Sequence, residues 1–146
     1  MWYKRKVKPQ DIEKIREFCK TEFGVRVHIT RYGGSSCLPE EKLIELDRRE
    51  ISTIQELYSM TFHELAHLYC YENNLFYIFH HDSLPDKEMA LYMKKMGVRV
   101  EKFVDKKGKE LMESFFPNIP FIGAYDDPKD VIWLKKWIKK NYPQAS

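Results

Sequence analysis

The segment His63-Glu64-Leu65-Ala66-His67 constrains this chain more than any other part of its sequence. In an α-helix, side chains four residues apart lie on the same face, so the two imidazoles can bind one Zn²⁺ ion together. The glutamate after the first histidine then stands beside the water that completes the metal shell, where it can act as general base. The motif therefore predicts a helix here, with a third metal ligand supplied by another segment.

The residues around the motif favour a helix over 53–71. Ser52 or Thr53 is suited to cap its N-terminus, and Glu56 follows at the spacing of a capping box. Apolar side chains recur at helical spacing along one side, namely Ile54, Leu57, Tyr58, Phe62, Leu65, Leu68 and Tyr69. The two motif histidines point away from this stripe, and the motif glutamate lies on its flank. We therefore favour a metal site over the alternative of two exposed histidines beside a glutamate.

The third ligand must come from a separate segment. His80 and His81 follow closely, but they belong to a loop-like run that ends at a proline. A helix is then predicted over 86–115, with Gly97 and Gly108 as weak points. Apolar side chains recur at helical spacing along one side of it, namely Met89, Met93, Met96, Val100, Val104, Leu111 and Phe115. Glu101 flanks this stripe, and Asp105 lies one turn further along the same edge. A carboxylate at the border of a buried face is well placed to meet a neighbouring helix, so Glu101 is the predicted ligand.

These motifs resemble those of gluzincin-type metallopeptidases, and most closely those of the small ImmA/IrrE-type proteins of bacteria, phages and mobile elements. The resemblance covers roughly residues 51–116 and lies in the HExxH segment, in Glu101-Lys102-Phe103-Val104-Asp105 and in Glu110-Leu111-Met112. SprT-like proteases share the first motif and are nearly as similar. The resemblance implies specific roles for five residues: zinc ligands at His63, His67 and Glu101, the general base at Glu64, and an orienting carboxylate at Asp105.

The N-terminal part of the chain predicts one helix and a small sheet. A helix is expected over residues 9–23, with Gly24 as its stop. Residues 25–30 alternate like a half-buried strand, and a second strand, interrupted by Pro39, is expected over residues 42–47. By resemblance to zincins, an edge strand beside the metal helix would pair with extended peptide substrate.

The fold class that follows is α+β, a minimal zincin-like domain. We expect a small antiparallel or mixed sheet packed on the HExxH helix, then a long helix carrying the third ligand, then a C-terminal helix. Asp127 as cap and Pro128 in the first turn begin that last helix. At 146 residues and 43% hydrophobic content, the chain is expected to form a single domain over residues 1–146.

A peptidase also needs a group that stabilises the oxyanion of the tetrahedral intermediate. His80, His81, Tyr92 and Tyr125 are each candidates for this role, and no rule of sequence separates them. His28 lies in a predicted strand and is interpreted as a packed or surface histidine.

The three cysteines, Cys19, Cys37 and Cys70, show no metal-binding or disulfide spacing. Cys70 is one turn beyond the motif and is interpreted as buried filler. Because the sequence also shows no signal peptide and no run of apolar residues that could span a bilayer, we expect a cytoplasmic protein with reduced thiols and no membrane partner.

The net charge of +3 is modest but unevenly distributed. Residues 1–8 hold four cations, and residues 130–140 hold four lysines around Trp133 and Trp137. A solvated lysine face on a docked helix is the favoured interpretation. A basic aromatic surface for nucleic acid is the alternative, which no recognised motif supports.

The sequence therefore predicts a zinc metalloendopeptidase with one Zn²⁺ ion, Glu64 as its general base, and a protein or peptide as its substrate. Two alternatives remain: a DNA-associated regulatory protein built on a zincin core, and a catalytically inactive metal-binding interaction module.

Overall fold

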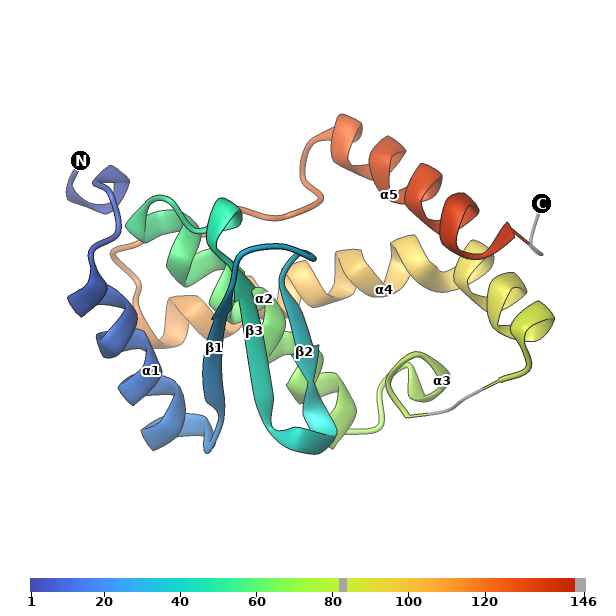
Figure 1. The fold of residues 1–146 in the computed structure, drawn as a ribbon, viewed down its shortest axis with the longest axis horizontal. Helices are drawn as coiled ribbons and strands as arrows, with labels where there is room; N and C mark the ends of the chain where they lie inside the picture. The colour runs from blue at the N-terminus through green and yellow to red at the C-terminus, as the bar shows by residue number, and fades with distance from the viewer. Residues whose placement is uncertain (82–83, 144–146) are drawn as a thin grey trace.

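A computed structural model describes residues 1–81 and 84–143. Within them the chain forms five α-helices and a three-stranded sheet (Figure 1). The elements run in the order α1 (Pro9–Phe23), β1 (Arg26–Thr30), β2 (Ser36–Leu38), β3 (Leu43–Asp47), α2 (Ile54–Glu72), α3 (Tyr77–His80), α4 (Asp86–Phe115) and α5 (Pro128–Asn141). Three short 3₁₀ helices add to these: η1 (Trp2–Lys4), η2 (Pro39–Glu41) and η3 (Arg48–Glu50). The predicted α+β class is confirmed.

Local signals determine where the long helices begin and end. The Thr53 hydroxyl accepts a hydrogen bond from the Glu56 amide, and the Glu56 carboxylate accepts one from the Thr53 amide, which is the predicted capping box. Gly24 ends α1 with a φ of 64°, a left-handed conformation that favours glycine. The Asp127 carboxylate caps α5 by accepting from the Lys129 amide. The predicted starts of α2 and α5 and the stop of α1 are confirmed.

The sheet is mixed, with β3 between the other two strands. β1 pairs with β3 in parallel, and β2 pairs with β3 in antiparallel orientation. The predicted second strand is confirmed as β3, but β2 was not predicted. Pro39 follows β2 directly and begins η2. The fixed φ and the missing N–H of Pro39 end β2. The interruption that the sequence predicted at Pro39 is therefore the boundary between β2 and β3.

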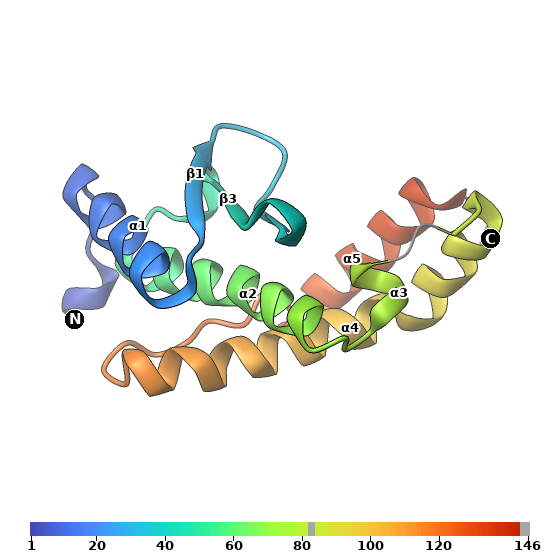
Figure 2. The same ribbon diagram turned by 90° about the horizontal axis from the view of Figure 1, so that it is seen from below.

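Helix α2 lies between two layers (Figure 2). The sheet and α1 lie on one side of it, α4 crosses its other side, and α5 runs along α4 in the opposite direction (Figures 1 and 2). The apolar side of α2 joins the main core, whose central side chains come from all layers: Ile15, Val25, Ile44, Leu46, Leu57, Phe62, Leu65 and Met112. Its opposite side is buried as well, because α4 covers it with Val100 and Val104.

The two glycines of α4 are points of close helix contact, which corrects their interpretation as weak points. A Cβ on Gly108 would lie 3.0 Å from the Phe62 carbonyl oxygen and 3.3 Å from the His63 Cα. A Cβ on Gly97 would meet the Ile138 side chain at 2.7 Å. Gly108 therefore lets α4 approach α2 directly at the motif, and Gly97 lets it approach α5.

Among the described residues, no helix is both long and apolar enough to cross a membrane.

Candidate metal centre

The motif residues lie in the middle of α2, on the side that α4 covers. His63, Glu64 and His67 keep only 4%, 4% and 8% of their surface exposed. Two exposed histidines without partners are therefore excluded. Buried polar side chains must satisfy one another or a bound ligand, because burial removes them from water.

Glu101 on α4 meets both histidines. Its Oε2 lies 3.1 Å from the His63 Nε2, and its Oε1 lies 3.3 Å from the His67 Nε2. One donor atom from each of the three residues lies within 4.8 Å of the other two. The carboxylate that the sequence analysis chose as third ligand, 34 positions after the second histidine of the motif, thus lies beside both histidines.

The spacing and chemistry of these atoms fit a metal ion. Two ligand atoms about 2.0–2.1 Å from a tetrahedral Zn²⁺ ion lie roughly 3.3–3.4 Å apart. The two N···O distances of 3.1 and 3.3 Å are close to that separation. His63, His67 and Glu101 could therefore hold a metal ion together, with two nitrogens and one carboxylate as donors.

Asp105 fixes the orientation of the first histidine. Its Oδ1 accepts a hydrogen bond of 2.7 Å from the His63 Nδ1, one turn of α4 beyond Glu101. A carboxylate only accepts, so the His63 Nδ1 carries a proton, and Nε2 is the ring nitrogen that faces Glu101. The backbone amides of Ala124 and Tyr125 also donate to Asp105, at 3.1 and 2.9 Å. These bonds connect the segment before α5 to the site.

His80 does the same for the second histidine, which the sequence did not indicate. The His80 Nδ1 lies 3.1 Å from the Leu75 carbonyl oxygen, and its Nε2 lies 3.1 Å from the His67 Nδ1. Because a carbonyl only accepts, the His80 proton lies on Nδ1 and its Nε2 accepts from the His67 Nδ1–H. The lone pair of His67 is then on Nε2, facing Glu101. Both histidines of the motif thus present Nε2 to Glu101.

The charged groups shift one another's pKa values. Burial raises the pKa of Glu101, but the two imidazoles outweigh it and hold that pKa well below its usual value. Burial lowers the pKa of His63, but its hydrogen bonds to Asp105 and Glu101 hold that pKa well above its usual value. Burial, helped by the nearby His67, lowers the pKa of His80 to about 4. His80 therefore stays neutral near pH 7 and keeps its acceptor nitrogen.

Glu64 has a buried carboxylate oxygen that the other described residues leave without a hydrogen bond. Its Oε2 is buried and has no hydrogen-bond partner among the described residues, while its Oε1 lies 3.9 Å from the His63 Nε2. Burial raises the pKa of this carboxyl. A buried carboxylate oxygen next to three atoms that could bind a metal ion is suited to hold a water molecule.

Of the four candidates for oxyanion stabilisation, Tyr125 lies at the site. Its ring centre is 6.1 Å from that of His63, and its side chain lines the same cavity as Glu101. Burial, together with the negative charges of Glu101 and Asp105, raises the pKa of Tyr125. The phenol therefore keeps its proton and can donate a hydrogen bond.

The other three candidates have different surroundings. His80 supports His67, as described above. His81 stacks between Tyr71 and Tyr77, with ring centres 4.0 and 4.5 Å away, and its Nε2 lies 2.7 Å from the Tyr71 carbonyl oxygen. Tyr92 packs at the apolar cluster between α4 and α5, where burial raises its pKa.

A cavity of about 630 Å³ opens onto the site. Glu101 and Tyr125 form part of its wall, and Trp133 and Trp137 of α5 line it further out. The loop of residues 33–35 forms another part of the rim. Two carboxylates hold that loop in place: Asp47 accepts from the Gly34 amide at 2.9 Å, and Glu50 accepts from the Ser35 amide at 2.7 Å.

The cysteines and His28, which the sequence analysis interpreted as structural or surface residues, lie outside the donor set. Cys70 is fully buried beside Val100 and Val104, as predicted. The three cysteines are free thiols. His28 is exposed on β1, 3.6 Å from the Glu45 carboxylate, and therefore is a surface histidine.

Comparison with models of known protein families, with curated proteins and with solved structures finds no match to this chain.

Proposed function

We propose that this chain is a zinc-dependent metalloendopeptidase of the gluzincin type, similar to the ImmA/IrrE-type proteins and, as a second choice, to the SprT-like proteases. The observation that carries the proposal is the buried Oε2 of Glu64, which has no hydrogen-bond partner in the described part of the chain and lies beside the His63, His67 and Glu101 donors. A merely structural polar cluster would satisfy that oxygen within the protein. Two imidazoles and one carboxylate are also the donor set of hydrolytic zinc sites, which keep one position open.

Each residue of the site has a separate role in the proposed hydrolysis. When bound, a Zn²⁺ ion supplies Lewis acidity that makes water nucleophilic near neutral pH. Glu64, whose pKa is raised by burial, accepts a proton from the attacking water and passes it to the leaving amine. The Tyr125 hydroxyl donates a hydrogen bond to the carbonyl oxygen as negative charge develops on it. Asp105 and His80 hold the two ligand histidines in the orientation that the site needs.

The substrate would be a peptide in extended conformation. Within the described residues, β2 pairs with β3 along one edge, and the loop of residues 33–35 that leads into β2 lines the cavity. An extended peptide can add to the other edge of β2 through backbone hydrogen bonds, which give affinity without reading sequence. Its scissile bond would then enter the cavity beside Glu101.

Three variants test the proposal against metal content and hydrolysis together. We expect protein purified without chelator to hold about one Zn²⁺ per chain and to cleave members of a fluorogenic peptide library. Glu64→Gln should keep the metal and lose about 10²–10⁴-fold in rate, because the general base is gone. His63→Ala should lose both metal and hydrolysis. His28→Ala is the matched control, since this exposed histidine lies outside the donor set.

Two results would overturn the proposal. Equal zinc content in His63→Ala and the unaltered protein would remove the metal site. Full zinc occupancy with no hydrolysis of any library member would leave a metal-binding module without peptidase activity.

A further inference from the structure

A second concave surface lies between α4 and α5, formed by other residues than those of the metal site. It is a groove of about 920 Å³, and eight residues line it: Lys94, Lys95, Val98, Arg99 and Lys102 of α4, and Lys135, Ile138 and Lys139 of α5. Six of these side chains are cationic and none is acidic. The six cations are exposed, whereas Ile138 is buried and Val98 is half-buried. The groove thus has an apolar floor between cationic walls.

Most of the positive charge of this groove is not paired with an acidic side chain of the described residues. In the part of the chain that the structure describes, five cations of the groove form no ion pair: Lys95, Arg99, Lys102, Lys135 and Lys139. Like charges on two adjacent helices repel one another, and an acidic ligand would relieve that repulsion. The charge pattern therefore points to an anionic partner.

We infer that this groove binds an acidic amphipathic helix of a partner protein. The groove runs between two helices that lie side by side in opposite directions (Figures 1 and 2). A third helix packs naturally between two such ridges and presents one apolar stripe to the floor. Its acidic side chains on either flank then meet the cations of α4 and α5. The methylene stems of the lysines extend the apolar floor that the stripe covers.

A nucleic acid is a poorer match for the same groove. Single strands are held by aromatic rings on which bases stack, together with cations along the backbone. The tryptophans of α5, Trp133 and Trp137, line the cavity of the metal site instead. Of the four lysines in the basic aromatic surface that the sequence offered as an alternative, Lys135 and Lys139 thus line a different cavity from the two tryptophans. A phosphate backbone would also have to cover Val98 and Ile138, which offer it no polar contact.

The test uses a defined probe, because the partner is not identified. The probe is a fluorescein-labelled synthetic helix of about 16 residues, with leucines at i, i+3, i+4 and i+7 positions and glutamates on both flanks. A peptide of the same composition with its leucines scrambled, a DNA duplex and a single-stranded oligonucleotide serve as comparisons. We expect saturable binding of the amphipathic peptide at micromolar concentrations, at least tenfold tighter than the scrambled one.

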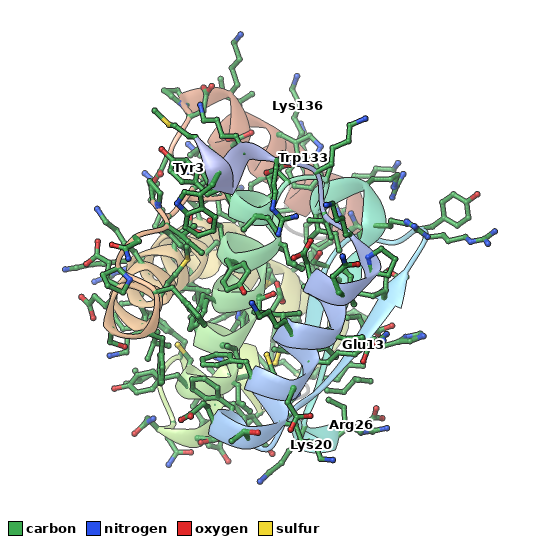
Figure 3. All side chains as sticks on the ribbon, turned by 90° about the vertical axis from the view of Figure 1, so that its left-hand side faces the viewer. Tyr3, Glu13, Lys20, Arg26, Trp133 and Lys136 are labelled. Carbon is green, nitrogen blue, oxygen red and sulfur yellow. The ribbon has the colours of Figure 1, made fainter. Side chains whose placement is uncertain are left out.

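Two pairs of substitutions locate the binding. The double substitution Arg99→Glu and Lys135→Glu reverses one charge on each wall. We expect it to raise the Kd of the amphipathic peptide by about tenfold or more. Lys14→Glu with Lys20→Glu changes the net charge equally on exposed positions of α1, and we expect binding within about twofold of the unaltered protein. Figure 3 shows Lys20 on α1 far from α5, where Lys136 projects. Val98→Asp tests the apolar floor and should weaken the same peptide.

Each contrary result refutes the inference. Equal losses in the two charge-reversed proteins would mean that only net charge attracts the peptide. Equal binding of the scrambled peptide would remove the role of the apolar floor. Tighter binding of either nucleic acid, lost in the Arg99→Glu and Lys135→Glu protein, would assign the groove to nucleic acid. None of these measurements depends on a bound metal, so they are separate from the test of peptidase activity.

Discussion

His80 offers the sharpest test of how the candidate metal centre is built. Replacement of His80 by phenylalanine keeps a ring of similar size next to Phe79, whose ring centre is 4.9 Å away. It removes the nitrogen that accepts the hydrogen bond from the His67 Nδ1 at 3.1 Å. The buried imidazole of His67 then has a donor without an acceptor, and nothing favours the tautomer with its lone pair on Nε2.

The expected size of the effect follows from that lost bond. A buried donor without its partner costs about 1–3 kcal/mol. Because about 1.4 kcal/mol corresponds to a tenfold change in a dissociation constant, the cost is on the order of ten- to a hundredfold. We therefore expect His80→Phe to raise the Kd for Zn²⁺ by about 10–100-fold, the range typical of groups that orient metal ligands.

Competition with a fluorescent zinc chelator measures this constant directly. His81→Phe is the matched control, because His81 is the next residue and stacks between Tyr71 and Tyr77, outside the donor set. We expect its Kd for zinc to stay within about twofold of the unaltered protein. His80→Gln should recover part of the affinity, since its amide oxygen can accept in place of the imidazole. Thermal unfolding of the metal-free proteins separates a general loss of stability from a loss of metal affinity.

His80 plays no part in metal binding if His80→Phe binds zinc as tightly as the unaltered protein while His63→Ala does not. His67 would then hold its orientation through the helix alone.

Three further predictions address other parts of the structure. Gly108→Ala should lower both the Tm and the zinc affinity, because its Cβ would lie 3.0 Å from the Phe62 carbonyl oxygen and push α4 from the motif; calorimetry and chelator competition measure the two. Tyr125→Phe should retain zinc and lower kcat by about 10²-fold or more if its hydroxyl stabilises the oxyanion. Asp47→Asn should lower the free energy of unfolding by about 2 kcal/mol at pH 7, because its carboxylate accepts from the Gly34 amide and from Arg49. Hydrogen bonds to Arg49 hold the pKa of Asp47 below its usual value, so this carboxylate stabilises the fold above about pH 4 and loses that effect as pH falls. Urea titrations across pH should therefore show the difference between the two proteins shrinking in acid.

Much of the local structure could be predicted from the sequence because its causes lie within a few residues of the chain. The Thr53 and Glu56 capping box, the left-handed Gly24 and the Asp127 cap each act on the nearest turn of a helix. The predicted range of 86–115 coincides with α4, since its apolar spacing persists along its whole length. The same spacing places the motif histidines on one face of α2.

The candidate metal ligands were predicted partly in the same way and partly by resemblance. His63 and His67 are four residues apart, so helix geometry alone brings them together. Glu101 was chosen as a carboxylate at the edge of an apolar stripe, and the packing of α4 on α2 brings it to both histidines. Asp105 follows from the same crossing, one turn later along the same edge.

The sequence by itself thus determined the helices, their ends and the pairing of two imidazoles, because each depends on neighbours in the chain. Only the tertiary structure decided that His80 orients His67, that Gly108 sets how closely α4 meets α2, and that β1 pairs in parallel with β3. It also placed Trp133 and Trp137 in the lining of one cavity and Lys135 and Lys139 in the lining of another. These features join residues of different elements, and their energies arise from packing and buried hydrogen bonds that exist only once the helices have docked.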